Sequence, residues 1–267
     1  DEAIETTKIH SVAGLLKDTG SGIITQRPFR SPHHTASAVS IIGGGHNSLP
    51  GEISLANNGV LFLDELPEYP RATLETLRQP LEDGNITVTR INRTVRYPAN
   101  VMLVASMNPC PCGNKGSATR KCTCSLNDIK RYMDKLSGPL LDRFDICTPI
   151  DDISFDDYIS TTLIEDSGTV RERIQRARKI QEERYKGTGI FTNARMTTQQ
   201  LNTYCVLDKE SENVLRNAFA KYNLTARGIT RVKKIARTIA DLNGRDKIAQ
   251  TDIWEAISLR TGFSELG

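Results

Sequence analysis

The sequence has 267 residues, of which 38% are hydrophobic and 25% charged, a composition that suits a globular protein with a sizeable core. No apolar run approaches the roughly 20 residues of a membrane span, and the first ten residues are mixed and charged, unlike a signal peptide, so we expect a cytoplasmic protein without a membrane partner. The formal net charge of +3 is too small to demand a nucleic-acid partner.

The first part of the chain has the pattern of a parallel α/β sheet. Up to about residue 150, short apolar runs alternate with helical stretches and loops rich in glycine and proline. Residues 60–63 and 101–105 are uninterrupted apolar runs, which predict strands buried on both faces. A helix is predicted between them over residues 71–81.

From residue 151 onward the pattern is helical. Apolar side chains recur at helical spacing over residues 170–185, with Ile174 on the apolar face, and over residues 229–242. Basic side chains of the second helix, such as Arg237, are interpreted as its solvated face or as a basic surface. The sequence thus predicts an α/β core over residues 1–150 and an all-α domain over residues 151–267.

A short final helix is predicted over residues 251–260. Thr251 is its expected cap, and Ile253, Trp254 and Ile257 are expected to face inward.

Two adjacent carboxylates follow the first apolar strand. Asp64 and Glu65 stand where this strand ends, and open α/β sheets bind ligands at the carboxyl ends of their strands. Nucleotide hydrolysis uses such a pair unequally: one carboxylate holds Mg²⁺, usually through water, and the next orients or deprotonates the attacking water. The alternative is a buried strand that ends in solvated acids.

Two further polar residues come later in the same region. Asn108 follows the second strand, where its amide could hold water against a terminal phosphate. Arg143 stands beside two acids at the end of a predicted helix.

These segments resemble Walker B, sensor 1 and the arginine-finger segment of AAA+ ATPases. Other segments resemble the YifB/ComM group of magnesium-chelatase-like proteins, and the resemblance runs from residue 1 to the final helix. The segments that carry this resemblance are RPFRSPHH at 27–34, GGG at 43–45, PGEISL at 50–55, LRQPLEDG at 77–84 and MNPCPCG at 107–113.

The resemblance implies a parallel-sheet AAA+ core followed by an all-α lid. It also implies a bacterial ATPase that uses ATP and Mg²⁺ and assembles into a hexameric ring. Such a ring would work on DNA, as ComM-type branch-migration helicases do in transformation and recombination. By the same resemblance Asp64 is the magnesium-side carboxylate, acting through water, Glu65 activates water, Asn108 is a sensor, and Arg143 reaches the neighbouring subunit's nucleotide.

Nucleotide binding by the lid is also implied by the resemblance. Arg227, at the start of the 229–242 helix, is the second sensor, and Arg231 is the alternative.

The sequence departs from this family in one respect. The phosphate-binding pattern Gly-x-x-x-x-Gly-Lys-Ser/Thr occurs nowhere in it. In the family this loop comes shortly before the segment that matches residue 1. We therefore expect a truncated fragment that binds ATP poorly and is inactive, and an active ATPase in the full-length protein.

Four of the six cysteines fall within a short segment. Cys110, Cys112, Cys122 and Cys124 have the number and proximity of a structural zinc site. An iron–sulfur cluster and four reduced thiols without a metal are the alternatives. The remaining two, Cys147 and Cys205, are predicted to be buried packing residues.

Residues 86–97 alternate like a β-hairpin with a turn near Asn92. In related ATPases such a hairpin faces the central channel, so Arg90, Arg93 and Arg96 are candidate DNA-binding residues; charges that only keep an exposed hairpin in solution are the alternative.

The histidines carry weaker signals. His33 and His34 fall in a predicted loop, and the resemblance implies a role near the pore or the nucleotide that the sequence does not specify. His10 and His46 are solitary, and an ordinary surface or core position is expected for them. The same position, without a metal, is the alternative for His33 and His34.

Two other functions remain open from the sequence. One is the motor ATPase subunit of a magnesium chelatase, which drives metal insertion into a porphyrin. The other is a non-catalytic scaffold, which would follow if the native protein also lacked the phosphate-binding loop.

Overall fold

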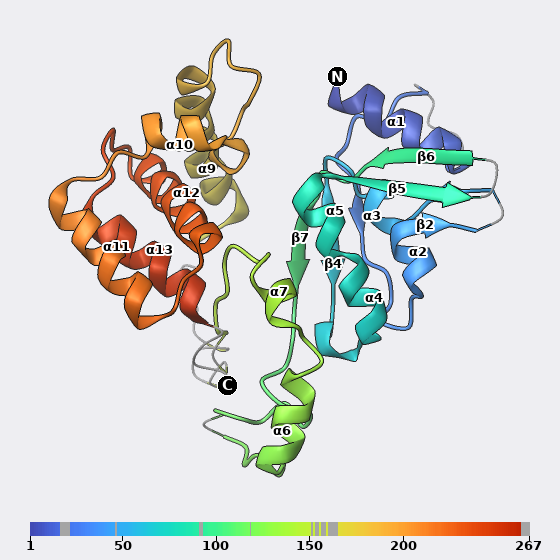
Figure 1. Cartoon of the computed structure of the whole chain (residues 1–267), viewed down its shortest axis with the longest axis horizontal. Helices are drawn as coiled ribbons and strands as arrows, with labels where there is room; N and C mark the ends of the chain where they lie inside the picture. Colours follow the sequence, from blue (N-terminus) through green and yellow to red (C-terminus); the bar gives the residue numbers. More distant parts are fainter. Residues whose placement is uncertain are drawn as a thin grey trace. The chain divides into compact units, whose positions relative to one another are not determined.

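The computed structural model describes residues 1–16, 22–45, 47–90, 93–117, 119–150, 152, 155, 159 and 165–262. The chain forms two compact units, Asp1–Phe144 and Asp145–Gly267. The first combines a parallel sheet with helices, and the described part of the second is helical (Figure 1). The predicted fold class is thereby confirmed, whereas separate folding of residues 1–150 and 151–267 stays a prediction.

The sheet of the first unit consists of three short parallel strands. They are β1 (Phe29–Arg30), β4 (Val60–Leu63) and β7 (Met102–Ala105), with β4 in the middle. Val60 pairs with Phe29 on one side and with Met102 on the other. Both predicted strands are therefore present, and their carboxyl ends lie at the same edge of the sheet.

The two faces of this sheet differ, which corrects the prediction that the strands are buried on both. Successive side chains of a strand point to opposite faces. Leu61 and Leu63 of β4 are fully buried and belong to the core of this unit. On the other face Met102 is 65% exposed, and Phe29 and Val104 are exposed too.

The predicted helix over residues 71–81 is two helices, α4 (Arg71–Thr76) and α5 (Arg78–Asp83), that meet at Leu77. Pro80 explains the break, because it has no N–H for the carbonyl four residues earlier and its ring crowds that carbonyl. Leu77 itself is buried in the core.

The predicted hairpin is confirmed as β5 (Asn85–Arg90) and β6 (Arg93–Pro98), which are antiparallel, with Arg90 paired to Arg93 at the turn. Tyr97 is buried, and its hydroxyl donates to the Ser48 carbonyl at 2.8 Å.

The first unit contains further short elements, of which the sequence pattern singled out only the helix before Arg143, which is α7 (Gly138–Leu141). The others are α1 (Glu2–Val12), α2 (Ala38–Ile42), β2 (Gly43–Gly44), β3 (Leu49–Pro50), α3 (Glu52–Leu55), η1 (Leu66–Glu68) and α6 (Leu126–Met133).

The described part of the second unit packs helices around one apolar core. Val232, Ile235, Ala236 and Ile239 of α12 are buried there, as the helical spacing predicts. The elements are α9 (Ser167–Arg184), η2 (Asn193–Arg195), α10 (Thr198–Tyr204), α11 (Lys209–Lys221), α12 (Ala226–Leu242) and α13 (Gln250–Thr261).

Some details of these helices were predicted wrongly. Ile174 of α9 and Trp254 of α13 are about half exposed, because each helix buries a narrower stripe than its apolar residues suggest. Thr251 is not the cap, since α13 begins after Ala249, whose N–H donates to the Asp252 carboxylate at 2.8 Å. Arg237 is 2% exposed and not part of a solvated face.

Within the described residues, we find no helix that is both long and apolar enough to cross a membrane.

Candidate functional site

The ends of β4 and β7 bring Asp64 and Ser106 into contact. Ser106 follows β7 directly, and its N–H donates to the Leu63 carbonyl at 3.1 Å, which continues the pairing of the two strands. The Ser106 hydroxyl donates to Asp64 Oδ1, and the Glu65 N–H donates to the same oxygen at 3.0 Å. The sequence reasoning missed Ser106, although its position one residue past a strand end was a usable signal.

Glu65 has an unusual backbone. Its φ of 52° and ψ of 48° lie in the left-handed region, which costs a residue with a side chain roughly 1–3 kcal/mol. The Leu66 N–H, which donates to the Ser106 carbonyl at 2.9 Å, holds this turn. Strain of this kind often occurs at functional sites, and here it directs the Glu65 side chain away from the strand path.

The Glu65 carboxylate is in contact with His34. His34 Nδ1 lies 3.1 Å from Glu65 Oε2, and the His34 ring lies 4.0 Å from that of His33 and edge-on to Tyr69. The Tyr69 hydroxyl donates to the Pro32 carbonyl at 2.5 Å and so anchors the histidine loop. Burial, with the charge of Asp64, raises the pKa of Tyr69 to about 12, so this donor stays protonated.

Asn108 lies two residues beyond Ser106 and is exposed. The Asn108 backbone N–H donates to the hydroxyl of Tyr132 in α6. Gly113 of the following loop lies close to the Asn108 side chain, because a Cβ added at Gly113 would be 3.8 Å from Asn108 Cγ. Burial, reinforced by the charge of Glu68, raises the pKa of Tyr132 to about 12. Asp64, Glu65 and Ser106 thus form a contact cluster, and Asn108 belongs to the same strand end.

Arg143 is held within its own unit. Its Nη2 contacts the Glu82 carboxylate of α5, and its Nη1 donates to the Pro139 carbonyl at 2.7 Å. The side chain is only 11% exposed and lines a hollow of about 290 Å³ with residues of α4 and α5. A role for Arg143 at a neighbouring subunit therefore requires that it leave Glu82.

The two arginines predicted as second sensors differ in their surroundings. Arg227 is exposed in the first turn of α12. Thr225 caps the N-terminus of this helix, because its side chain accepts from the Gly228 N–H at 3.0 Å. Arg231 Nη1 lies 2.5 Å from Asp145 Oδ1. Arg227 as the second sensor, with Arg231 as the alternative, stays a prediction.

Of the hairpin arginines, Arg96 is exposed, and its Nε donates to Asn85 Oδ1 at 2.9 Å. The side chains of Arg90 and Arg93 lie outside the described part of the chain. The structure therefore gives these two only backbone positions at the turn.

The four clustered cysteines are brought together. Their Sγ atoms all lie within 4.8 Å of one another. Of the other two, Cys205 is buried, and burial raises its pKa to about 11, whereas Cys147 is only partly buried, contrary to its predicted packing role.

Of the other two histidines, the structure describes only His10. His10 Nε2 lies 3.0 Å from the Leu55 carbonyl, which is a packing contact, and His46 lies outside the described residues.

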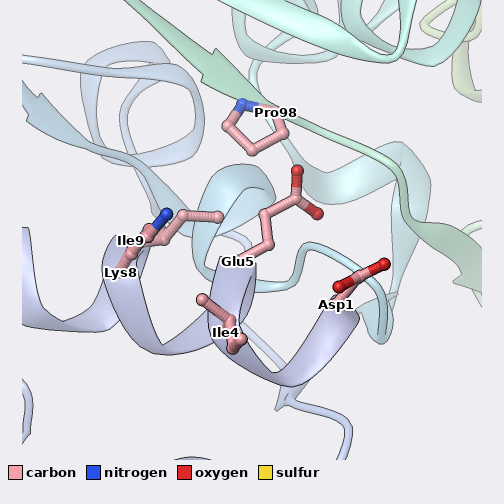
Figure 2. Close-up of a pocket in the computed structure, with 6 residues that line it drawn as sticks. All are labelled: Asp1, Ile4, Glu5, Lys8, Ile9 and Pro98. Atoms are coloured by element: carbon pink, nitrogen blue, oxygen red, sulfur yellow. The ribbon is translucent and has the colours of Figure 1, made fainter.

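A hollow of about 580 Å³ lies along α1 (Figure 2), lined by Asp1, Ile4, Glu5, Lys8, Ile9 and Pro98. The Glu5 carboxylate accepts from the side-chain amides of Asn57 and Asn58 at 2.8 and 2.7 Å, so its role is structural. None of the predicted site residues lines this hollow.

The carboxylate oxygens at the end of β4 suit a magnesium ion as ligands. Both hydrogen bonds to Asp64 use Oδ1, and the carboxylate is exposed. Carboxylate oxygens are the ligands that Mg²⁺ prefers, and it commonly retains several waters beside one or two of them.

Comparison with known proteins identifies relatives that match most of the chain. The family model "Magnesium chelatase, subunit ChlI" matches residues 1–158, and "Magnesium chelatase, subunit ChlI C-terminal" matches residues 164–260. The chain is 42% identical over 261 residues to the competence protein ComM of Haemophilus influenzae. It is 41% identical over 263 residues to the uncharacterized protein YifB of Salmonella typhimurium.

These two matches cover 97% of the chain but 50% of each relative, so the chain spans about half the length of the curated relatives it matches. The magnesium-chelatase subunit ChlI of Mesostigma viride is 26% identical over 214 residues, which are 79% of the chain and 51% of that relative.

Proposed function

The chain belongs to the family of magnesium chelatase subunit ChlI, and on that premise we propose that it carries the hydrolytic carboxylates of an ATP-driven AAA+ motor. The observation that supports this most is the Asp64, Glu65 and Ser106 cluster, which joins the ends of two parallel strands. Asp64, oriented by Ser106, would hold Mg²⁺ through water. The metal would supply charge neutralisation on the phosphates.

Glu65 is the proposed base for the attacking water. Its left-handed backbone turns it out of the strand direction, and His34 holds its carboxylate from one side. Asn108, on the next strand end, is the proposed sensor of the terminal phosphate. The phosphate-binding loop is absent from these 267 residues, so we assign ATP binding and turnover to the full-length protein.

The finer proposal is a ComM-type motor that acts on DNA as a ring, with six subunits as the proposed number and Arg143 as the residue that completes a neighbour's site. The identity of 42% to a competence protein, against 26% to a chelatase subunit, favours this type over porphyrin metallation. The hairpin β5–β6, which carries Arg90, Arg93 and Arg96, is the proposed DNA contact.

The proposed base is tested in the full-length protein with Glu65→Gln. The amide keeps the size of the side chain but cannot take a proton, so the variant should bind ATP and fail to hydrolyse it. The matched control is Glu68→Gln, which neutralises an exposed carboxylate of the next turn, paired to Lys135 at 3.3 Å. A Glu65→Gln protein that hydrolyses ATP as fast as the control would overturn the role of Glu65.

The DNA contact is tested separately by replacing Arg90, Arg93 and Arg96 together with alanine. If each arginine contacts one phosphate of a single strand, the slope of log binding constant against log salt should fall by about 2. Arg131→Ala, an exposed arginine of α6 near Asp128, is the control. Unchanged DNA affinity and slope in the triple variant would remove the hairpin from the DNA site and leave the ATPase proposal standing.

A further inference from the structure

The loop after β7 gathers four thiol groups at one point. Cys110 Sγ lies 3.4 Å from Cys112 Sγ and 3.6 Å from Cys122 Sγ, and the Cys112 to Cys122 separation is also 3.6 Å. Cys124 completes the set, since all four sulfurs lie within 4.8 Å of one another. All four are free thiols, so no disulfide accounts for the cluster.

These separations match a single tetrahedral ion. Zinc binds thiolates at about 2.3 Å, so the sulfurs of a four-cysteine zinc site stand about 3.8 Å apart. In a cubane iron–sulfur cluster each cysteine binds a different iron, which spreads the sulfurs farther than the spacing found here. The geometry therefore favours one metal ion over a cluster.

The backbone around the sulfurs is arranged to stabilise negative charge. The Lys115 N–H donates to Cys110 Sγ at 3.3 Å, and backbone groups of Asn114 and Thr123 hydrogen-bond to Cys112. Four thiolates around one Zn²⁺ carry a net charge of −2. The loop itself brings three cations close in sequence, at Lys115, Arg120 and Lys121.

The loop also lacks other means of holding its shape. Between Ala105 and Leu126 the described residues form no helix or strand. Loops longer than about 12–15 residues without secondary structure are uncommon in compact domains unless something orders them. Here α6 begins immediately after Cys124, with Ser125 as its cap.

We propose that Cys110, Cys112, Cys122 and Cys124 bind one structural zinc ion, which orders the loop from Asn108 to α6. Asn108 is separated from Cys110 by one residue, and Gly113 of the loop lies against its side chain. Zinc therefore fixes the segment that carries this side chain. The metal site itself does not depend on the proposed ATPase function.

The first test is elemental analysis of the 267-residue chain purified without chelators. We expect about one zinc per chain, with no comparable iron. The chain grown with cobalt should show the intense thiolate-to-cobalt and d–d absorption of a tetrahedral four-sulfur site. Cys112→Ser should lower the zinc content about tenfold or more, whereas Cys147→Ser, outside the cluster, should leave it unchanged.

A second test reports on the loop and does not require the variant to fold. Lys115, Arg120 and Lys121 are trypsin sites inside the loop. In the metal-bound chain they should be cut slowly, and stripping the metal with a strong chelator should expose them at least about tenfold more.

Three results would overturn the proposal. One is a chain without zinc whose four thiols all react freely. Another is iron at one per chain in place of zinc, and the last is trypsin cleavage in the loop that metal removal does not change.

Discussion

Asp241 is fully buried in the helical unit, and its replacement by asparagine should strongly destabilise that unit. Its carboxylate accepts from Arg184 Nη1 and Nη2 at 2.7 and 2.5 Å, from Asn193 Nδ2 at 2.8 Å and from Arg237 Nε at 3.0 Å. These contacts join α9, η2 and α12, and α12 carries Arg227 in its first turn. The network thus holds the helix of the proposed second sensor.

The size of the effect follows from burial. Asn keeps the volume of Asp but removes the charge, and its amide NH₂ group would face the N–H groups of the arginines. Removing one partner from a buried ion pair costs about 3–5 kcal/mol, because the remaining charge is left without compensation. Arg237 also donates to the Asp246 carbonyl at 2.6 Å, so the low end of this range is expected.

Trp254, the single tryptophan of the chain, lies in α13 of the same unit, so its fluorescence reports unfolding there. With a urea dependence of about 1.5 kcal/mol/M, a loss of 3 kcal/mol should lower the unfolding midpoint by about 2 M. The matched control is Glu212→Gln, which neutralises an acid in an exposed pair with Arg216 at the same four-residue spacing. Its expected effect is below about 0.5 kcal/mol.

A second replacement separates charge burial from packing. Adding Arg184→Met to Asp241→Asn removes one uncompensated cation, so part of the lost stability should return. The reasoning is refuted if Asp241→Asn shifts the midpoint no more than Glu212→Gln does.

Three further predictions concern the α/β unit. In the full-length protein, Glu65→Gln and Arg143→Ala should each lower ATPase activity, and the Arg143→Ala loss should be about 10³-fold. Mixing the two variants should restore part of the activity, because each supplies the residue that the other lacks. If demonstrably mixed rings recover no activity, Arg143 acts within its own site. His34→Ala should lower kcat about tenfold or more with ATP binding unchanged, and His34→Gln should restore part of the rate. An unaltered kcat in His34→Ala would show that His34 does not position Glu65. Gly59→Ala should destabilise the sheet by about 2–3 kcal/mol, because the added Cβ would be 2.0 Å from a backbone oxygen of the segment before β1. Hydrogen exchange of the β4 amides measures this loss. Amide protection in β4 equal to that of the unsubstituted protein would contradict the prediction.

The position of the candidate site was readable in the sequence because it depends on local order. An apolar run followed by two acids predicts a strand that ends in carboxylates, and parallel strands bring their ends to one edge. The partners of those acids were not readable in this way. Ser106 meets Asp64 through the register of β4 and β7, and His34 meets Glu65 through the path of the loop after β1.

The helical unit shows the same limit. Apolar spacing predicts the buried side of α12, yet Arg237 has the spacing of a solvated residue on that helix. It is buried because Asp241, one turn later, together with carbonyls beyond the helix end, satisfies its guanidinium. The helical pattern cannot reveal this, since it records only how apolar side chains repeat.

Patterns among neighbouring residues were sufficient for the fold class, the strand-end carboxylates, the hairpin and the cysteine set, because each depends on short-range spacing. The folded chain decided which side chains touch: Ser106 with Asp64, His34 with Glu65, Arg143 with Glu82. The residues of each pair are separated by 31 to 61 positions in the sequence. Contacts over such separations depend on strand register and core packing, which no local pattern contains.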